Sequence, residues 1–240
     1  MHYAEIQPTV ALRPWVECFW SVRGDRDDKA ERPVLPDGCA DLVFDLNSGE
    51  AVVVGTMTRP LLVEGDGDFF GVRFRPGRAA AFLKLPLAEI TDARVPLADV
   101  WRDADVAQTL LSAFDDRRQE CLRYIEHALL RRLDPDRDRR VDAAVERIIA
   151  SGGTIRIDDM AREIGISRQH LARQFLHHVG IAPKTFARVM RFRRVLESLR
   201  GAVDWADVAS AHGYYDQSHL IAEFRELAGS TPSAFHFSNR

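Results

Sequence analysis

The sequence predicts an α+β protein of two domains, a β-rich N-terminal domain that also contains helices and an all-α C-terminal domain. Three observations support this prediction. Short segments rich in Val, Phe and Trp fill the first third of the chain, whereas helical periodicity dominates its last hundred residues. Between them, LDPDRDRR is polar and contains a proline, as linkers often do. We therefore expect one domain at 1–133, a linker at 134–140 and a second domain at 141–240.

Five segments of the N-terminal domain are predicted to be strands, because β-branched and aromatic residues fill them and turn-forming residues bound them. In CADLVFDL, for example, the apolar residues alternate with aspartates and a valine, the period of a strand with one buried face. The periodicity becomes helical after Pro76. The predicted strands are 15–23, 39–46, 51–57, 60–65 and 68–74, and the helices predicted after them are 77–85, 104–114 and 117–133.

The C-terminal domain is predicted to be helical throughout, and its helices have recognisable ends. Ser167 is of a residue type that is favoured just before a helix, where its hydroxyl accepts a backbone hydrogen bond. Glycine follows several of the predicted helices, where it adopts a left-handed conformation without steric cost. The predicted helices are 141–151, 157–164, 167–179, 184–199, 204–211 and 216–228.

Two of these helices carry the same motif. HLARQF at 170–175 recurs as HLIAEF at 219–224, and a Gly-x-x-Pro follows each copy at the same distance. Upstream of each copy lies a short helix, which stops at Gly165 in the first copy and precedes Gly213 in the second, where the turn is one residue longer. A short helix, a glycine-containing turn and a second helix form the pattern of a helix-turn-helix unit. The sequence therefore predicts two tandem units, joined by a long helix at about 185–199.

The second helix of the first unit is predicted to expose a face suited to DNA. Leu171, Phe175 and Val179 recur at i, i+4 and i+8 and form a buried stripe. Gln169 and Arg173 are four residues apart and face outward together. Arg can bind the O6 and N7 atoms of guanine and Gln can read adenine, so this face has the chemistry of base recognition in a major groove.

Charge is distributed unevenly along the chain, which has a formal net charge of −3. Residues 156–200 contain ten basic and four acidic residues, a net charge of +6, whereas 201–240 contain two basic and five acidic residues. A basic block in an acidic protein indicates an anionic partner that meets this block alone. The alternative is a solvated helical face with no partner.

The repeat is most specific in two segments, AxxxGYYDQSHLIAEFRELAGSTPSAF at 209–235 and SRQHLARQFLHHVGIAPKTF at 167–186. They resemble the DNA-binding domain of bacterial AraC/XylS-type transcriptional regulators. The resemblance implies two helix-turn-helix subdomains joined by one long helix, with recognition helices in successive major-groove segments on one face of double-stranded DNA. It also implies a cytoplasmic transcription factor, and it allows a homodimer and a contact with RNA polymerase.

The predicted DNA contacts follow from residue type and position. Such families often carry Arg at the groove-facing position of both recognition helices, but here Arg173 in the first copy corresponds to Ala222 in the second. We therefore expect the first subdomain to provide most of the affinity and base readout. His170 and His219 are expected to pack between helices rather than bind ligands. The candidate base-reading residues are Arg168, Gln169, Arg173, Gln217 and Ser218, and the candidate phosphate contacts are Ser167, Lys184, Arg191, Arg193, Arg194 and Thr231.

The N-terminal segments RPWVECFWSVRG and LPDGCADLVFDL, together with residues 71–101, resemble N-terminal domains of unassigned function that precede AraC-type domains. The resemblance implies a module that senses a small-molecule effector and dimerises, often as a small cupin-like barrel. Cupin-type metal sites need clustered histidines, and the strand region has only His2, so neither a metal nor another cofactor is expected. The candidate effector-binding residues are Trp20, Asp37, Cys39, Phe44, Arg73 and Phe74, with burial in the core as the alternative for the aromatic ones.

Two alternative functions stay open at this point. A DNA-repair or DNA-modifying protein could use an AraC-type domain for targeting, but Cys18 and Cys39 do not supply the zinc-binding cysteine cluster that such proteins require. A redox sensor would need an exposed cysteine of low pKa. The chain has no glycine-rich phosphate loop, G-x-S-x-G or H-E-x-x-H motif, so we do not expect an enzyme. It also lacks a signal-peptide pattern and any apolar run near the roughly 20 residues that cross a bilayer, so we expect a cytoplasmic protein with no membrane partner.

Overall fold

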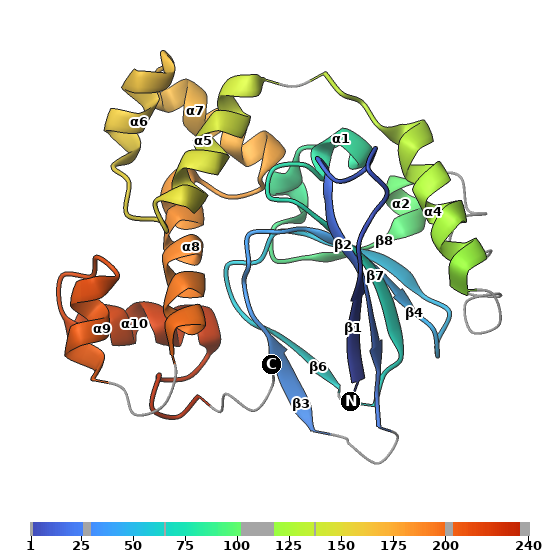
Figure 1. Ribbon diagram of the computed structural model, residues 1–240, viewed down its shortest axis with the longest axis horizontal. Helices are drawn as coiled ribbons and strands as arrows, with labels where there is room; N and C mark the ends of the chain where they lie inside the picture. Colours follow the sequence, from blue (N-terminus) through green and yellow to red (C-terminus); the bar gives the residue numbers. More distant parts are fainter. Residues whose placement is uncertain are drawn as a thin grey trace.

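The computed structural model describes residues 2–25, 30–64, 66–101, 118–136, 138–199 and 204–235. The described residues of the N-terminal part contain eight strands: β1 His2–Ile6, β2 Val16–Arg23, β3 Glu31–Val34, β4 Asp41–Asp45, β5 Ala51–Val54, β6 Leu61–Glu64, β7 Phe69–Phe74 and β8 Arg94–Pro96. Six of them form an antiparallel sheet in the order β1-β2-β7-β4-β5-β8, and β3 pairs with β6 in a separate ribbon (Figure 1). Among the described strands the larger sheet is open, because β1 and β8 each have one neighbour.

All five predicted strands are confirmed as β2, β4, β5, β6 and β7. The sequence does not predict β1, β3 and β8, and each has a physical reason to be missed. β1 and β8 are the outer strands of the sheet, so few of their side chains are buried and no apolar period marks them. β3 is the four-residue segment ERPV, whose charged residues and proline are unusual for a central strand.

The larger sheet has one apolar face and one mixed face. Phe44, Phe70 and Phe74 on the apolar face are fully buried. The helices that follow the sheet contribute Phe82 and Leu129 to the same core. These helices are α1 Ala80–Leu83, the 3-10 helix η1 Leu87–Ile90, α2 Leu97–Val100 and α4 Arg118–Arg132. The predicted helix at 77–85 is thus only one turn long, the one at 117–133 is confirmed as α4, and the one at 104–114 lies outside the described residues.

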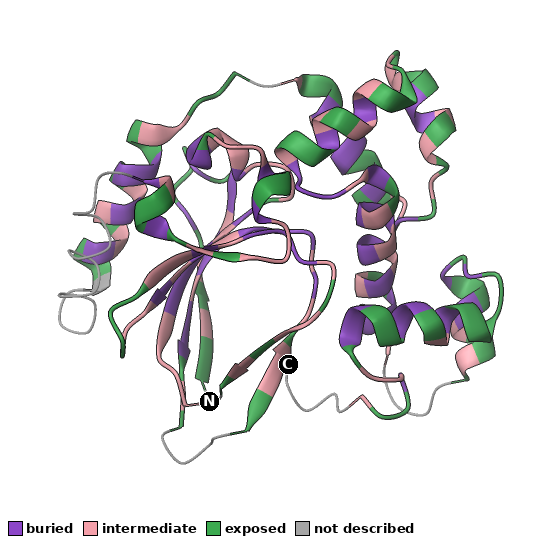
Figure 2. Ribbon diagram, turned by 180° about the vertical axis from the view of Figure 1, so that it is seen from behind, coloured by how far each residue is buried: buried purple, intermediate pink, exposed green. Residues whose placement is uncertain are grey.

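In the C-terminal part, the described residues form helices and no strands, as predicted. Its helices are α5 Arg139–Ala150, α6 Ile157–Ile164, α7 Arg168–His178, α8 Pro183–Ser198, α9 Trp205–Ala211 and α10 Gln217–Ala228. Figure 1 shows α8 as a column with α5, α6 and α7 at one end and α9 and α10 at the other. Half of the residues of α8 are buried, whereas exposed residues gather on the outer sides of the flanking helices (Figure 2). No helix of the described ranges is long and apolar enough to cross a membrane.

The N-terminal part packs against the C-terminal end of α7. The hydroxyl of Thr56 donates a hydrogen bond to the carbonyl of Val179 at 2.6 Å, and the hydroxyl of Thr91 donates one to the carbonyl of Gly180 at 2.6 Å. Both carbonyls directly follow the last residue of α7, where intrahelical donors run out. The two threonines therefore cap α7 from the other half of the chain.

A second contact joins the N-terminal part to α8. Arg193 donates a hydrogen bond from Nη1 to the carbonyl of Asp37 at 3.1 Å. The next residue, Gly38, has a φ of 81°, and a Cβ there would lie 2.6 Å from the ring of Phe186. Glycine is therefore required at this turn both for its backbone conformation and for the close approach of α8.

Candidate nucleic-acid interface

The first helix-turn-helix unit, α6 and α7, has the predicted geometry. Gly165 ends α6 with a φ of 77°, the left-handed conformation that the turn requires. The hydroxyl of Ser167 accepts a hydrogen bond from the backbone N–H of His170 at 3.2 Å and so begins α7. Gln169 and Arg173 are both exposed on the side of α7 away from the core.

The second unit, α9 and α10, repeats this construction. Gly213 in its turn has a φ of 74°. The carboxylate of Asp216 accepts a hydrogen bond from the backbone N–H of His219 at 2.7 Å, at the position that Ser167 has in the first unit. Gln217 and Ser218 are exposed at the start of α10. The two units are therefore built alike, as the repeat predicts.

The buried faces of the two units also correspond. Phe175 of α7 contacts Phe186 edge-on at a ring distance of 6.0 Å. The equivalent Phe224 of α10 contacts Phe235 edge-on at 5.5 Å. Phe175 and Phe224 are at most 1% exposed. The shared Phe and the aromatic residue eleven positions later thus form the same packing pair in both copies.

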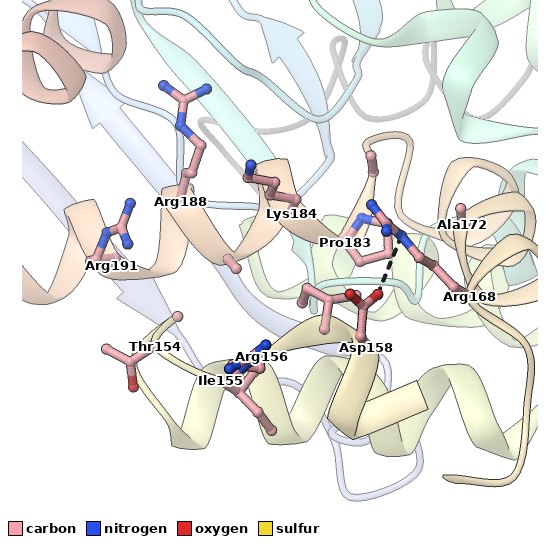
Figure 3. A pocket seen from close by; sticks show the side chains of 14 residues that line it. Thr154, Ile155, Arg156, Asp158, Arg168, Ala172, Pro183, Lys184, Arg188 and Arg191 are labelled. Atoms are coloured by element: carbon pink, nitrogen blue, oxygen red, sulfur yellow. Dashed lines mark ion pairs between the residues drawn. The ribbon is translucent and has the colours of Figure 1, made fainter. Parts of the chain in front are cut away.

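A basic groove of about 430 Å³ lies between the start of α6, the start of α7 and one side of α8. Arg156, Arg168 and Lys184 line it, and Figure 3 shows Arg168 beside Asp158, with 3.4 Å between the guanidinium and carboxylate. Among the described residues that line this groove, Asp158 is the only acid. The groove therefore favours an anionic occupant.

Four of the six candidate effector residues come together on the mixed face of the larger sheet. The indole of Trp20 donates a hydrogen bond to Asp41 at 2.7 Å. The Nε atom of Arg73 lies 3.4 Å from a carboxylate oxygen of Asp37 and 3.4 Å from one of Asp41. The backbone N–H of Cys39 donates to the carboxylate of Asp37 at 2.9 Å. Trp20, Asp37, Cys39 and Arg73 therefore belong to one polar cluster.

The other two, Phe44 and Phe74, lie on the opposite face of the sheet. Both are fully buried in the apolar core. Adjacent residues of a strand point to opposite faces, so Phe74 cannot share a surface with Arg73. These two aromatic residues consequently serve packing, the alternative that the sequence leaves open.

Burial controls the ionisation of the polar cluster. Desolvation raises the pKa of Asp41 to about 6, and the nearby Asp37 adds to the rise, whereas Arg73 opposes it. Burial also raises the pKa of the Cys18 thiol to about 12 and that of Cys39 well above its usual range. All three cysteines are buried and none forms a disulfide. A redox sensor needs an exposed thiolate, so this geometry disfavours that alternative.

Residues 160–236, which span α7 to α10 and most of α6, match a family model described as a helix-turn-helix domain. Both units carry the turn, the caps and the signature residues described above. The chain carries an AraC-type DNA-binding domain. It is thus a DNA-binding protein of the class that regulates transcription. Residues 4–96 match a family model described as a domain of unknown function, DUF6597, and cover the sheet that precedes the AraC-type domain.

Solved structures of ToxT from Vibrio cholerae resemble the chain at low identity. An apo ToxT variant is 13% identical with a TM-score of 0.43, and the match covers 90% of this chain and 95% of that one. ToxT bound to (E)-4-(8-methylnaphthalen-1-yl)but-3-enoic acid is 10% identical, with a TM-score of 0.45 and coverage of 90% and 95%. ToxT bound to an unsaturated fatty acid is 13% identical, with a TM-score of 0.39 and coverage of 96% and 92%. No curated protein matches the chain.

The candidate phosphate contacts of the AraC-type domain fall into two groups. Lys184 and Arg194 are exposed on α8, Thr231 is half-buried after α10, and Ser167 caps α7. Arg191 and Arg193 depart from the expectation, because their guanidinium groups are engaged within the protein. Arg193 binds the carbonyl of Asp37, as described above, and Arg191 binds a carboxylate of α10.

That carboxylate belongs to Glu223, which is 3% exposed. Arg191 donates to its Oε1 and Oε2 atoms at 3.0 and 2.8 Å, and the Nε atom of Arg188 donates to Oε2 at 2.9 Å. Arg188 also binds Glu226 with its other guanidinium nitrogens. Burial alone would raise the pKa of Glu223, but the hydrogen bonds from the two arginines outweigh it and lower the pKa below its usual value.

The histidines of the repeat differ in their contacts. The Nδ1 atom of His170 lies 3.0 Å from Nη2 of Arg173, and its Nε2 atom lies 3.5 Å from the carboxylate of Asp138. The ring of His219 packs edge-on against Tyr214 at 5.3 Å. His219 is exposed and contacts a residue of the preceding turn, and half-buried His170 contacts the exposed Arg173 that is a candidate for base readout.

Helix α8 presents different sides to the groove and to the N-terminal part. Lys184, Arg188 and Arg191 line the groove and project from one side of α8 (Figure 3). Phe186 and Arg193, which meet the Asp37–Gly38 turn, lie two residues further along. Two residues correspond to about 200° around an α-helix. The N-terminal part therefore packs behind α8 and leaves the basic groove open.

Three residues at or beside the basic groove are not among the predicted contacts. Arg156 and Arg188 line the groove, and Glu223 anchors α10. Arg156 could have been found, since it starts the first unit inside the basic block. The sequence indicates the burial of Glu223 only weakly. Glu223 follows Leu220 by three residues, which places it beside the buried stripe of α10.

Proposed function

We propose that the protein is a sequence-specific regulator of transcription that binds double-stranded DNA through α7 and α10 and responds to a small molecule on its N-terminal domain. The observation that carries the proposal is the pair of matching helix-turn-helix units at the two ends of α8, with a basic groove beside the first. α8 has 16 residues and, at about 1.5 Å per residue, a length of about 24 Å. With the offset of each unit, this length suits recognition helices one DNA turn, about 34 Å, apart.

In this proposal α7 enters a major groove, and Gln169 and Arg173 read base edges there. Both side chains are exposed and four residues apart, and they match the hydrogen-bonding edges of adenine and guanine. Arg168 flanks them at the start of the helix. The backbone of the DNA passes the basic groove, where Arg156 and Lys184 face its phosphates.

The second unit contributes less readout. Gln217 and Ser218 are the polar residues at the exposed start of α10, and Ala222 occupies the position of Arg173. The arginines of α8 nearest to α10 are neutralised by Glu223 and Glu226. We therefore assign base readout mainly to the first unit and positioning on the DNA mainly to the second.

The effector is proposed to bind the mixed face of the larger sheet, at Trp20, Asp37, Cys39 and Arg73. Support comes from Asp37, which belongs to both the polar cluster and the domain contact. Its carboxylate faces Arg73, while its carbonyl accepts the hydrogen bond of Arg193 on α8. A ligand that displaces the Asp37 carboxylate from Arg73 would therefore shift the turn that touches α8.

The test is selection of bound duplexes from a random pool by the full-length protein, repeated with metabolite extract. We expect one enriched site of two subsites about one turn apart. Its affinity should fall as salt rises, with a log–log slope of about −0.9 per phosphate contacted. The double substitution Gln169→Ala and Arg173→Ala should abolish the enrichment. No enrichment by the wild-type protein, or equal enrichment by the double variant, would refute the assigned interface.

A further inference from the structure

Glu223 is a charged side chain in a place where the repeat does not require one. The first unit has Gln174 at the equivalent position, which is half-buried. The side chain of Glu223 is only 2% exposed, and both of its oxygens are bound by arginines of α8. A buried ion pair contributes little net stability, because desolvation of the charges offsets their attraction. The hydrogen bonds of such a pair form only in a narrow range of geometries. The pair is therefore suited to fixing the orientation of α10 on α8.

The network around Glu223 ties α10 to α8 at several points. Arg191 binds the carboxylate with two nitrogens, and its guanidinium lies 4.4 Å from the ring centre of Tyr214 in the turn before α10. Arg188 bridges Glu223 and Glu226, one turn apart on α10. A guanidinium that is planar and bound on two edges tolerates little rotation of its partner.

Apolar contacts alone would hold α10 less specifically. Phe192 of α8 packs edge-on against Phe224 of α10 at a ring distance of 5.1 Å. The hydrophobic burial of these rings has no direction, and the edge-on preference of an aromatic pair is weak, so the contact permits small rotations. At the other end of α8, Phe186 and Phe175 fix α7. The arginine–glutamate network therefore adds a directional constraint on α10 to the packing of its buried residues, among them Phe224 and Leu227.

We propose that Glu223, held by Arg188 and Arg191, sets the separation and angle of the two recognition helices and so determines which spacing of DNA subsites the protein accepts. The inference rests on the proposed DNA-binding function. One base pair moves a subsite by about 3.4 Å and turns it by about a tenth of a helical turn. A fixed α10 can meet its subsite at one spacing, whereas a loosely held α10 can follow a displaced one.

The experiment uses duplexes with the selected subsites at their best spacing and with one base pair added or removed. The readout is the ratio of affinities at the best and the shifted spacings, so a general change in charge cancels. The affinity of the wild-type protein should fall roughly tenfold when the subsite spacing changes by one base pair, a loss comparable to that of one base-pair contact. Glu223→Leu should bring this affinity ratio close to one or change the spacing that binds best. Glu223→Gln should give a ratio between that of Glu223→Leu and that of the wild-type protein.

The matched control is Glu163→Gln, which removes the exposed ion pair between Arg147 and Glu163 without touching the contact between α8 and α10. It should keep the wild-type ratio. A wild-type ratio in folded Glu223→Leu or Glu223→Gln would overturn the proposal and leave Glu223 a purely stabilising role. If Glu223→Leu does not fold, the ratio for Glu223→Gln decides. Failure of the wild-type protein to bind any duplex would instead refute the proposed function.

A second readout needs no DNA. Nitroxide labels on Gln169→Cys and Ala222→Cys, both at exposed positions of the recognition helices, report the distance between α7 and α10. The three native cysteines are buried, which limits labelling to the introduced pair. We expect one narrow distance distribution in the otherwise wild-type protein and a broader or displaced one with Glu223→Leu or Glu223→Gln. An unchanged distribution would contradict the positioning role.

Discussion

In the first unit α7 exposes Gln169 and Arg173 and is capped at its end by threonines of the N-terminal part. In the second unit Ala222 replaces the arginine, and α10 turns its acidic residues toward α8. Each turn nevertheless contains a left-handed glycine, each recognition helix has a side-chain N-terminal cap, and the aromatic pairs correspond, although the segment between the helices is longer in the second unit. The two units thus share their internal packing but differ in their exposed residues. In this domain the residues that could read DNA can therefore change without a change in the core.

Removal of the shared phenylalanine from either unit should have the largest effect on stability. The two substitutions test whether the two cores contribute equally to the free energy of unfolding. Phe175→Ala and Phe224→Ala each remove a buried ring that packs edge-on against a second phenylalanine. We expect each to lower the free energy of unfolding by about 3–5 kcal/mol. Denaturant unfolding of the full-length protein measures both. Costs that differ severalfold would show that the units do not share one packing scheme.

The stability contributed by Glu223 in the second unit should depend on pH, unlike that of the equivalent Gln174 in the first unit. Because the pKa of Glu223 is lowered in the folded state, its ionised form stabilises the fold above about pH 4.5, and this contribution is lost as the pH falls. At pH 7 we expect Glu223→Gln to cost on the order of 3 kcal/mol in unfolding free energy. The cost should shrink toward pH 3.5. Gln174→Ala in the first unit serves as the control, since its cost should be small and independent of pH over this range.

Substitutions of the candidate base-reading residues should have a smaller effect, measured as DNA affinity and base preference. Arg173→Ala should weaken binding to the selected site by about 1–3 kcal/mol, the worth of a two-bond contact with guanine, and relax the preference at one base pair. Gln217→Ala should cost less and leave base preferences nearly unchanged. Fluorescence anisotropy with the selected duplex and its single-base variants measures both. Equal losses from the two substitutions would remove the difference in readout between the units.

The smallest effect concerns the helix caps. Ser167→Ala and Asp216→Ala each remove the side-chain oxygen that accepts the backbone hydrogen bond at the start of α7 or α10. Each should lower the free energy of unfolding by about 1 kcal/mol. Thermal melting of the two variants side by side is sufficient. A clear loss in one variant and none in the other would show that the capping geometry is not shared.

Features set by local sequence were predictable here. The helices of the AraC-type domain follow from an apolar period, a capping residue and a glycine, all within one segment. The strands with a buried face were likewise found, whereas β1 and β8 were missed because outer strands bury too little to show a period. Arg173 and Gln169 were identified as exposed because the buried stripe of α7 fixes its outer face.

Features set by partners distant in the sequence were not predictable. Arg191 looks like a phosphate contact in a basic block, but Glu223, 32 residues later, neutralises it. Arg193 is engaged by Asp37, 156 residues away. In the N-terminal part, alternation placed Arg73 and Phe74 on opposite faces, yet nothing local showed that Phe74 is core and that Arg73 faces two aspartates.

The central claim, that α7 and α10 bind one face of a duplex together, is tested most directly by hydroxyl-radical footprinting of the full-length protein on its selected site. We expect two protected segments on the same face, separated by about one helical turn of 10–10.5 base pairs. Arg173→Ala should weaken protection most in the segment that the first unit contacts. A single protected segment, or two segments on opposite faces, would contradict the claim.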